Sequence, residues 1–374
     1  MSNEEKTPNE LLKEFVDVYL APHNIQFGGD EFEIRFGTNK YNQITKTDFD
    51  SIIQKLKSLG FEKMKEGYTL NIINEYADPR TGKIRDSNIR TTIKGISNIQ
   101  KYCKENMIYE DKLKNISFLQ KFRKKTKRDG ETLTPIDFKD FQFRVNYKTE
   151  RSLDPVDGQP LKPEISRLFD TWKDSKKIFR LIKRYSFQKS GQANLYPFQF
   201  DLSIVKTNKQ RRLHNGRKIF IKEYSIQDSD IFNQPENYEV EMELINDSAK
   251  LYTTNTDDLI SKIKRGIKTI LSGWQGTNFP ISFKEQDKVK SEYMKLIHGE
   301  NMPLDRTGKP RRAHSGDFLG PSSISLETKN IMPIDIDSSM PNINNPYTVT
   351  DKADGERKLL FISNIGKIYL IDTN

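Results

Sequence analysis

The chain has 374 residues, with 62 Lys and Arg against 52 Asp and Glu, which gives a formal net charge of +10. Its length allows about two domains at roughly 150 residues each, and its 22 Phe and 15 Tyr argue against a disordered chain although only 34% of the residues are hydrophobic. The single cysteine, Cys103, excludes a disulfide framework and a thiolate zinc site.

No stretch approaches the roughly 18 uninterrupted apolar residues of a membrane span, and residues 1–10 lack the apolar core of a signal peptide. We therefore expect a soluble, cytoplasmic protein with no membrane partner. The excess of positive charge favours a polyanionic partner such as nucleic acid or nucleotide, and a merely solvated basic surface explains it equally well.

Two amphipathic helices are predicted near the N-terminus. The first begins at Thr7-Pro8-Asn9-Glu10, which has the form of a capping box with proline at the first helical position. The second is signalled by Thr47-Asp48 and ends at Gly60. Each carries an apolar stripe that needs a surface to cover.

Alternation with a period of two then predicts a mainly antiparallel β domain. The predicted strands are residues 31–37, 68–76, 88–95, 141–150, 179–187, 198–205, 217–226 and 238–244. A helical pattern from Asn255 to Leu271 ends at Ser272-Gly273, where we place the domain boundary. The expected domains are therefore residues 1–272 and 273–374, the second with a helix at 285–298 and two strand-like runs at its end.

The polar faces of these strands are unusual because charges of one sign line whole faces. Glutamates occupy one side of residues 31–37 and of residues 238–244, and basic side chains occupy one side of strands between them. In residues 179–187, Arg180 and Arg184 share a face, and a bulge in the strand would place Lys183 on that face instead. The one-sided residues are Glu31, Glu33, Arg35, Arg90, Lys94, Arg144, Lys148, Arg180, Arg184, Glu239, Glu241 and Glu243.

Two folds accommodate such faces. On a sandwich they would lie in solvent, whereas a closed barrel with its apolar face outward, beneath the helices, would bring them together in a polar tunnel. Several strands sharing the feature favour the barrel. Carboxylates gathered in an interior require a cation, and hard oxygen ligands select Mg²⁺ or Mn²⁺. With the basic residues, this is the equipment for hydrolysis of a triphosphate.

The motif E-x-E-x-R-F-G at residues 31–37 and the motif E-x-E-x-E at the end of the β domain resemble the triphosphate tunnel metalloenzyme superfamily. With the basic strands between them, they are similar to its RNA 5′-triphosphatase branch. The resemblance implies an α+β, mainly β fold in which an eight-stranded antiparallel tunnel barrel has flanking helices.

The same resemblance implies roles for individual residues. Glu31, Glu33 and Glu243 would bind Mg²⁺ or Mn²⁺, and Glu239 and Glu241 would place the water or add charge. The basic residues would bind the phosphates of the substrate, 5′-triphosphate RNA. Asp201 and Ser203, in a segment like the family's D-L-[ST] strand, share a face and could bridge to a tunnel arginine, although a lone strand aspartate is more often a structural hydrogen-bonder.

A second motif, K-x-D-G-x-R, spans Lys352 to Arg357. Alone it is weak, since a turn between strands explains it and DNA and RNA ligases share K-x-D-G. With the strand-like flanks and residues 320–327 it resembles the entry to a covalent nucleotidyltransferase of the mRNA guanylyltransferase type. The resemblance implies that Lys352 attacks the α-phosphorus of GTP and that Arg357 contacts the ribose.

The order of the two activities is similar to that in the mRNA-capping enzymes of large cytoplasmic DNA viruses. That resemblance implies mRNA 5′ capping, in a viral factory or virion if the source is a virus, with further capping domains or a methyltransferase subunit as possible partners. A small-molecule nucleoside or inorganic triphosphatase of the same superfamily is one alternative, which K-x-D-G-x-R disfavours. A non-catalytic RNA-binding module is another, which the five glutamates disfavour.

We predict that this chain alone forms little covalent GMP adduct. After residues 366–374 the sequence lacks the family's later D-G-E and K-x-K-P-type motifs and its lid, so we expect a fragment of a longer capping protein or a vestigial transferase. Without those groups GTP is poorly held and Lys352 stays protonated. Labelling with radioactive GTP and denaturing electrophoresis measures the adduct, and a strong band that Lys352→Ala removes would contradict the prediction.

Overall fold

The protein is described by a computed structural model. It describes residues 6–21, 29–38, 43–78, 80–110, 113–123, 133–156, 158–214, 216, 218–319, 325–333, 341–346, 348 and 357–372. The chain divides into two compact units, Met1–Pro280 and Ile281–Asn374. The division falls after Pro280, further along the chain than the boundary expected at residue 272.

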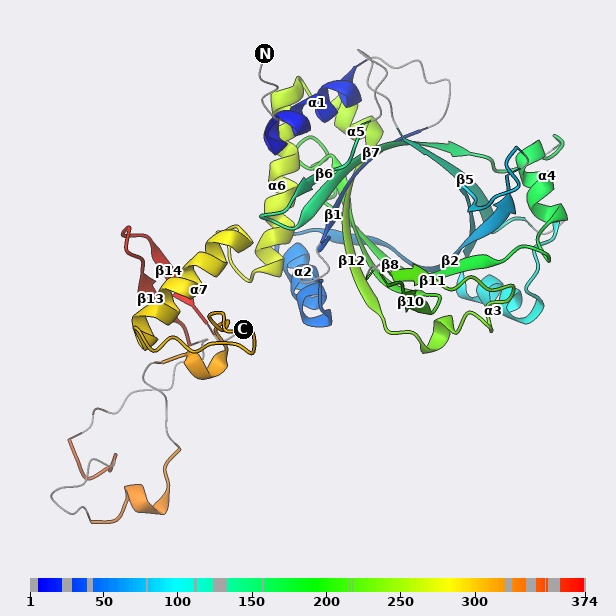
Figure 1. Ribbon diagram of the computed structural model, residues 1–374. Coiled ribbons are helices and arrows are strands. Elements are labelled where there is room, and N and C mark those ends of the chain that lie inside the picture. The colour runs from blue at the N-terminus through cyan, green and yellow to red at the C-terminus, as the bar shows by residue number, and fades with distance from the viewer. Residues whose placement is uncertain are drawn as a thin grey trace. The chain divides into compact units, whose positions relative to one another are not determined.

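Eight antiparallel strands close into a barrel in the first unit (Figure 1). Around the ring they follow the order β1-β12-β9-β8-β2-β4-β5-β7, and the pairing of β1 with β7 closes it. The bounds are β1 Gly29–Phe36, β2 Glu62–Ala77, β4 Ile89–Lys94, β5 Ile116–Arg123, β7 Phe143–Ser152, β8 Lys177–Gln188, β9 Phe198–Thr207 and β12 Asn237–Leu244. The closed ring confirms the predicted mainly β, eight-stranded antiparallel barrel and excludes the sandwich.

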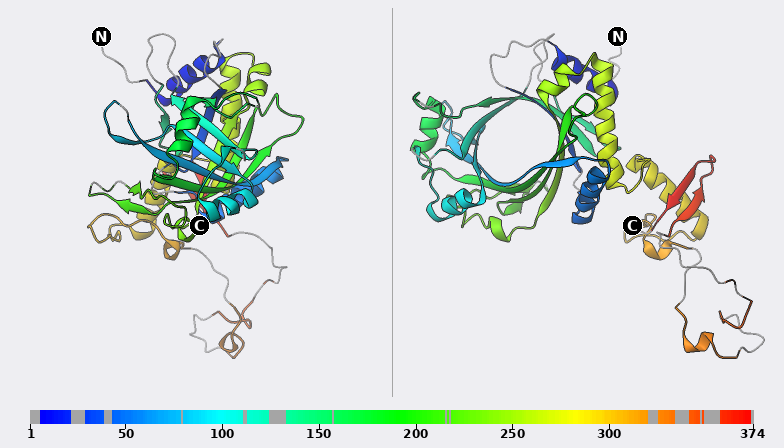
Figure 2. Two further views of the ribbon diagram at one scale, coloured as in Figure 1. Left: turned by 90° about the vertical axis from the view of Figure 1, so that its right-hand side faces the viewer. Right: turned by 180° about the vertical axis from the view of Figure 1, so that it is seen from behind.

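Short strands extend this ring. Strand β3 (Ile84–Asp86) pairs with β2, and β6 (Ile136–Phe138) pairs with the first three residues of β7. Strands β10 (Gln210–Arg212) and β11 (Lys218–Phe220) form a separate two-stranded hairpin directly after β9. Figure 2 shows the barrel from two further sides.

Every barrel strand except β5 coincides with a predicted segment. Strand β5 was missed because it carries apolar residues on both faces: Phe118 is buried on the outer face, whereas Leu119 lies on the opposite face with Lys121, so that period two is obscured. Conversely, the prediction that residues 217–226 form a barrel strand was wrong. Only Lys218–Phe220 is a strand, because its partner β10 offers three residues for pairing.

Helices cover the barrel on two sides (Figure 1). On one side lie α1 (Pro8–Leu20), α2 (Lys46–Ser58) and α6 (Thr256–Trp274), and α5 (Asn246–Leu251) precedes α6. Thr7 closes the capping box with Glu10 as predicted, whereas α2 is capped by Thr45 rather than Thr47. On the other side lie α3 (Ile96–Glu105) and α4 (Pro163–Asp170).

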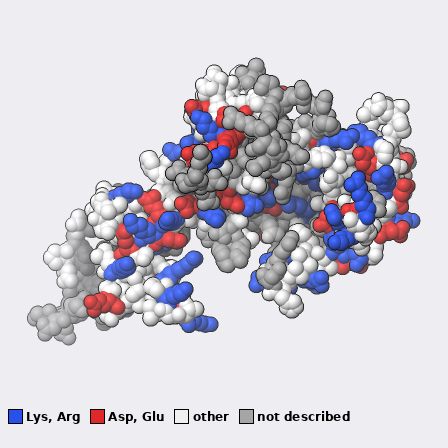
Figure 3. All heavy atoms as spheres, turned by 45° about the horizontal axis from the view of Figure 1, so that its top comes forward, with Lys and Arg blue, Asp and Glu red and all other residues white. Residues whose placement is uncertain are grey.

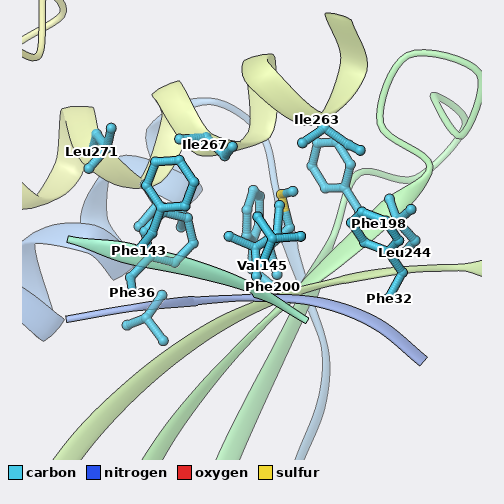
Figure 4. Packing of buried hydrophobic residues seen from close by; sticks show 14 of the residues in the cluster. Phe32, Phe36, Phe143, Val145, Phe198, Phe200, Leu244, Ile263, Ile267 and Leu271 are labelled. Atoms are coloured by element: carbon cyan, nitrogen blue, oxygen red, sulfur yellow. The ribbon is translucent and has the colours of Figure 1, made fainter. Parts of the chain in front are cut away.

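The apolar faces of the strands point outward to these helices. Beneath α3 and α4, side chains such as Leu70, Phe118 and Phe179 join Ile165 and Trp172 in one buried cluster. The larger cluster lies between β1, β7, β9 and β12 and the helices α1, α2 and α6. It includes Phe32, Phe36, Phe143, Val145, Phe198, Phe200, Leu244, Ile263, Ile267 and Leu271 (Figure 4).

Helix α6 continues through Ser272 and Gly273, so these residues do not end the helix as expected. A Cβ atom on Gly273 would lie 2.9 Å from Ile52 Cα and 3.0 Å from Lys55 Cβ, both on α2. Contacts this short are essentially absent between real Cβ atoms and their neighbours. The glycine therefore allows the two helices to approach closely.

The second unit has its own small core. Helix α7 (Phe283–His298) packs against the hairpin of β13 (Leu359–Ile362) and β14 (Ile368–Ile371), with Val289, Tyr293 and Phe361 buried between them. Among the described residues of the whole chain, the model contains no helix that is both long and apolar enough to cross a membrane.

We predict that Gly273→Ala destabilises the first unit by about 1–3 kcal/mol, because the added methyl group must push α6 away from the α2 backbone. In an exposed helix the same change would be stabilising by up to about 1 kcal/mol. Ser261→Ala, on the exposed face of α6, is the matched control. Urea unfolding measures the free energy, and an unchanged or higher stability for Gly273→Ala would show that α2 and α6 do not pack this closely.

Candidate active site

The register of the barrel strands brings the charged faces together in its interior. Glu33 on β1 lies opposite Glu243 on β12 and opposite Asn146 on β7. Two residues further along β1, Arg35 lies opposite Glu241. Because the apolar neighbours of these residues are buried beneath the helices, strand alternation turns the charged side chains to the inside.

Arginines neutralise one part of this interior. Arg184 on β8 donates to Asp201 (2.9 Å), to the Ser203 hydroxyl (3.0 Å) and to Glu241 (3.3 Å). Asp201 is only 2% exposed and also accepts a hydrogen bond from Ser186 at 2.6 Å. Asp201 and Ser203 thus bridge to an arginine, as their shared face indicated.

The remaining glutamates of β12 are held in the same way. Arg35 forms an ion pair with Glu241 at 2.9 Å and with Glu239 at 3.7 Å. Arg180 on β8 also pairs with Glu239. Glu239 and Glu241 therefore position three arginines.

Glu33 and Glu243 differ because, in the described part of the chain, no arginine forms an ion pair with either of them. Glu33 is 8% exposed and accepts from Asn146 at 3.1 Å and Lys148 at 3.3 Å. The amide of Gln199 donates to Glu243 at 3.4 Å. These two facing carboxylates therefore have fewer cations than the glutamates beside them.

Burial and like charges oppose ionisation of these groups. Burial, followed by the charges of Glu241 and Glu31, raises the pKa of Glu33 above its ordinary range. Burial, followed by the charges of Asp201 and Glu31, raises the pKa of Glu243 to about 7. Burial also raises the pKa of Glu31 despite a nearby lysine. This part of the interior therefore favours a bound cation.

That lysine is Lys121 on β5, which was not singled out as a site residue. Its amino group contacts Glu31 at 2.8 Å and Glu150 at 2.7 Å. It is the first residue of the dense basic run 121–130, of which residues 124–130 lie outside the described residues. The sequence did indicate that Glu150 shares a strand face with Lys148. Its partner Lys121 could not be predicted, because β5 was not recognised as a strand.

The other predicted basic residues occupy different positions. Arg90 lies on the interior face of β4, and its buried Nε has no hydrogen-bond partner among the described residues. Lys94 is exposed at the end of the same strand. Arg144 shares the face of Arg35 but is held by Asp137 on β6, at 2.7 and 2.8 Å. Lys183 lies on the outer face with Glu66 (3.4 Å), so no bulge substitutes it for Arg184.

No three Asp, Glu, His or Cys side chains in the described part of the chain are arranged so that they could hold a metal ion. The predicted ligands Glu31, Glu33 and Glu243 nevertheless fit a cation by their chemistry, because Glu33 is a buried carboxylate, Glu31 and Glu243 are half-buried, and the pKa of each is raised. A pair of carboxylates suffices for Mg²⁺, which keeps several waters and takes further ligands from substrate phosphates.

In the second unit, Lys352 lies outside the described residues, as does most of K-x-D-G-x-R. The guanidinium of Arg357 lies 4.6 Å from the centre of the Phe318 ring. The neighbouring Asp317 is 5% exposed and accepts from Arg311 at 2.7 and 2.8 Å. Over the face of the molecule in Figure 3, Lys and Arg are interspersed with Asp and Glu, so the net charge forms no single basic surface there.

Comparison with known proteins gives one relative by sequence. A stretch of 140 residues, 37% of the chain, is 32% identical to the "Probable mRNA-capping enzyme" of Acanthamoeba polyphaga mimivirus. The match spans only 9% of that relative's length. No protein-family model matches the chain.

Solved structures that match this chain include two RNA triphosphatases. The RNA triphosphatase domain of the mimivirus mRNA-capping enzyme is 17% identical, with a TM-score of 0.42, and covers 71% of this chain and 98% of its own. The S. pombe RNA triphosphatase is 12% identical, with a TM-score of 0.35, and covers 73% of this chain and 93% of its own.

The sequence similarity to a viral mRNA-capping enzyme agrees with the resemblance that the motifs indicated. The chain is a homologue, over 140 residues, of the mimivirus mRNA-capping enzyme, and its closed eight-stranded barrel, with charges of both signs inside, fits a triphosphate tunnel.

Proposed function

We propose that the barrel unit is an RNA 5′-triphosphatase that acts in mRNA capping. The observation that carries this proposal is the facing pair of Glu33, which is buried, and Glu243, which is half-buried, because the pair is short of cations. Arg184 and Lys148 lie in the same interior. A closed polar interior with excess carboxylate on one side and cations on the other accepts a metal-bound triphosphate.

Glu33 and Glu243 would hold a divalent ion, Mg²⁺ or Mn²⁺, with Glu31 beside them. When bound, the ion would neutralise phosphate charge and favour attack by water. The raised pKa values support this assignment, because a cation removes the repulsion that opposes their ionisation. Three ligating side chains are not assembled in the described residues, so substrate phosphates and water would supply the remaining ligands.

The basic residues bind and orient the substrate in this proposal. Arg184, Lys148 and Arg90 hold oxygens of the β- and γ-phosphates, and Glu239 and Glu241 fix the arginines that face them. Water attacks the γ-phosphorus, and the bond from that phosphorus to the β–γ bridging oxygen breaks. The products are RNA with a 5′-diphosphate, inorganic phosphate and a proton.

Two alternatives remain distinct from this proposal. A small-molecule triphosphatase would have the same interior, and similarity to a viral capping enzyme supports RNA as the substrate instead. A non-catalytic RNA-binding module needs cations to bind the phosphates of RNA. It has no need of interior carboxylates whose charge is incompletely neutralised. Release of phosphate from triphosphate-ended RNA, with and without Mg²⁺ or Mn²⁺, separates the three.

For residues 273–374 we propose the beginning of an mRNA guanylyltransferase. The support is K-x-D-G-x-R at Lys352 to Arg357 and the similarity to a capping enzyme. In this proposal Lys352 forms a covalent bond to GMP and releases pyrophosphate, and further capping domains or a methyltransferase subunit complete the pathway.

We predict that Glu33→Gln and Glu243→Gln each lower metal-dependent phosphate release at least about 100-fold, because each change removes a charged ligand that stabilises the transition state. Glu66→Gln is the matched control, since Glu66 pairs with Lys63 and Lys183 on the outer face. Circular dichroism verifies folding. Turnover by either interior variant within a few-fold of wild type would remove that glutamate from the metal site.

A second prediction concerns pH. The pKa of Glu243 is about 7 in the folded protein, against 4.5 for an ordinary glutamate. The folded state therefore binds this proton more tightly than the unfolded state does. The resulting stabilisation is fully present when the pH lies below the pKa of the unfolded state. That contribution is lost as the pH rises through about 7. Without divalent metal, Glu243→Gln should therefore raise the melting temperature more at about pH 8 than at about pH 5.5.

Divalent metal should stabilise the wild-type protein with the same dependence on pH. Added Mn²⁺ should raise its melting temperature more at about pH 8, where Glu243 is ionised, than at about pH 5.5. Glu66→Gln again serves as the control. Equal effects of Mn²⁺ at both pH values would show that Glu243 does not bind the ion.

A further inference from the structure

The β10–β11 hairpin presents unpaired basic side chains to one mouth of the barrel. Residues 209–220 read KQRRLHNGRKIF and contain no Asp or Glu. Arg211, Arg212 and Lys218 are exposed, and among the described residues no carboxylate pairs with any of them. Most other strand cations of this barrel have a carboxylate partner, so the hairpin stands out as a place for an external anion.

The hairpin borders a cavity that includes residues of the interior site. The cavity has a volume of about 280 Å³, and its lining contains Gln210 and Phe220 from the hairpin together with Arg35, Arg180 and Glu239 from the barrel. Phe220 is 38% exposed. A ligand that extends from the interior arginines through this mouth would therefore pass beside the Phe220 ring.

The register extends this path along the hairpin. Gln210 pairs with Phe220, and Arg212 pairs with Lys218. Because residues two apart in a strand share a face, Arg212 and Lys218 lie on the same side as the two cavity-lining residues. The path therefore runs from the interior arginines past one aromatic ring to two unpaired cations.

Buried hydrogen bonds fix the base of the hairpin to the strand that carries Arg180. Asn208 is fully buried; its side-chain oxygen accepts from the Phe179 amide at 2.6 Å, and its amide donates to the Ile221 carbonyl at 2.8 Å. The Ile221 amide also donates to the Lys209 carbonyl at 2.9 Å. The hairpin therefore holds Phe220 at a set position beside the barrel mouth.

Two carboxylates line the cavity, and arginines of the same lining balance their charge. Glu239 is paired with Arg35 and Arg180. Glu236 accepts a hydrogen bond from the Tyr238 hydroxyl at 2.9 Å. The cavity lining thus has two carboxylates against two arginines, and the exposed cations of the hairpin, Arg211, Arg212 and Lys218, leave this mouth with a net positive charge.

We propose that this hairpin binds the first nucleotides of the RNA, with a base stacked on Phe220 and backbone phosphates bound by Arg212 and Lys218. An aromatic ring beside cations is the usual arrangement for single-stranded nucleic acid, since every base has a face that stacks. The proposal rests on the proposed function for the orientation of the chain, with the triphosphate in the barrel. It adds a reason for the enzyme to act on RNA rather than on a free nucleotide.

Binding is measured by fluorescence polarisation with 3′-labelled RNAs of about ten nucleotides, one with a 5′-triphosphate and one with a 5′-hydroxyl. Phe220→Ala should weaken binding of both RNAs about tenfold. Arg212→Ala/Lys218→Ala should lower the slope of log affinity against log salt by roughly 1.4. Phe220→Leu, which keeps apolar bulk without an aromatic face, should behave like Phe220→Ala.

The matched control is Lys13→Ala/Lys264→Ala, which removes the same charge from helices α1 and α6 and should bind both RNAs as wild type does. Melting temperatures verify that each variant folds. Variants of the hairpin with wild-type RNA affinity and salt dependence would overturn the proposal. Equal displacement of the RNA by polyglutamate and by unlabelled RNA would also overturn it, since the hairpin would then be a site for an acidic peptide.

Turnover separates this proposal from the function on which it rests. In hairpin variants, kcat/KM for triphosphate RNA should fall about tenfold more than kcat/KM for GTP. If wild type releases phosphate from neither substrate, the proposed function fails, while loss of 5′-hydroxyl RNA binding in the variants still supports the hairpin site. If wild type hydrolyses RNA and the variants lose nothing relative to GTP, the hairpin proposal fails alone.

Discussion

A charged side chain inside the barrel loses its hydration, and only opposite charges or hydrogen bonds nearby compensate for that loss. Arg184 meets this condition with Asp201, Ser203 and Glu241 on neighbouring strands. Glu33 and Glu243 meet it only in part, and their pKa values rise as a result. The interior is thus stabilised where its ion pairs are complete, and its carboxylates resist ionisation where they are not.

Closure of the barrel makes this arrangement possible. A ring without edges satisfies the backbone hydrogen bonds of all its strands and gives every strand an inner and an outer face. The outer faces are covered by helices, with Phe32 and Phe198 beneath α1 and α6. Close approach at Gly273 allows α2 and α6 to pack side by side. The cost of burying charge inside is therefore offset by the apolar cores outside.

The two proposals divide one substrate between two kinds of surface. Facing carboxylates and cations in the interior suit the compact, highly charged triphosphate. The hairpin at the mouth, with Phe220 and unpaired Arg212 and Lys218, suits a chain of bases and singly charged phosphates. The buried side chain of Asn208 connects the two, because it bonds both to β8 and to the base of the hairpin.

The sequence by itself determined which residues share a strand face, because side-chain alternation is a local property with a period of two. It therefore placed Glu31, Glu33 and the β12 glutamates correctly on one-sided charged strands. Only the tertiary structure decided that β1 pairs with β7 to close the ring, that Asp137 takes Arg144, and that Lys121 lies between Glu31 and Glu150. These facts depend on contacts between strands far apart in the chain, and the register of such contacts is set by the packing of the whole barrel.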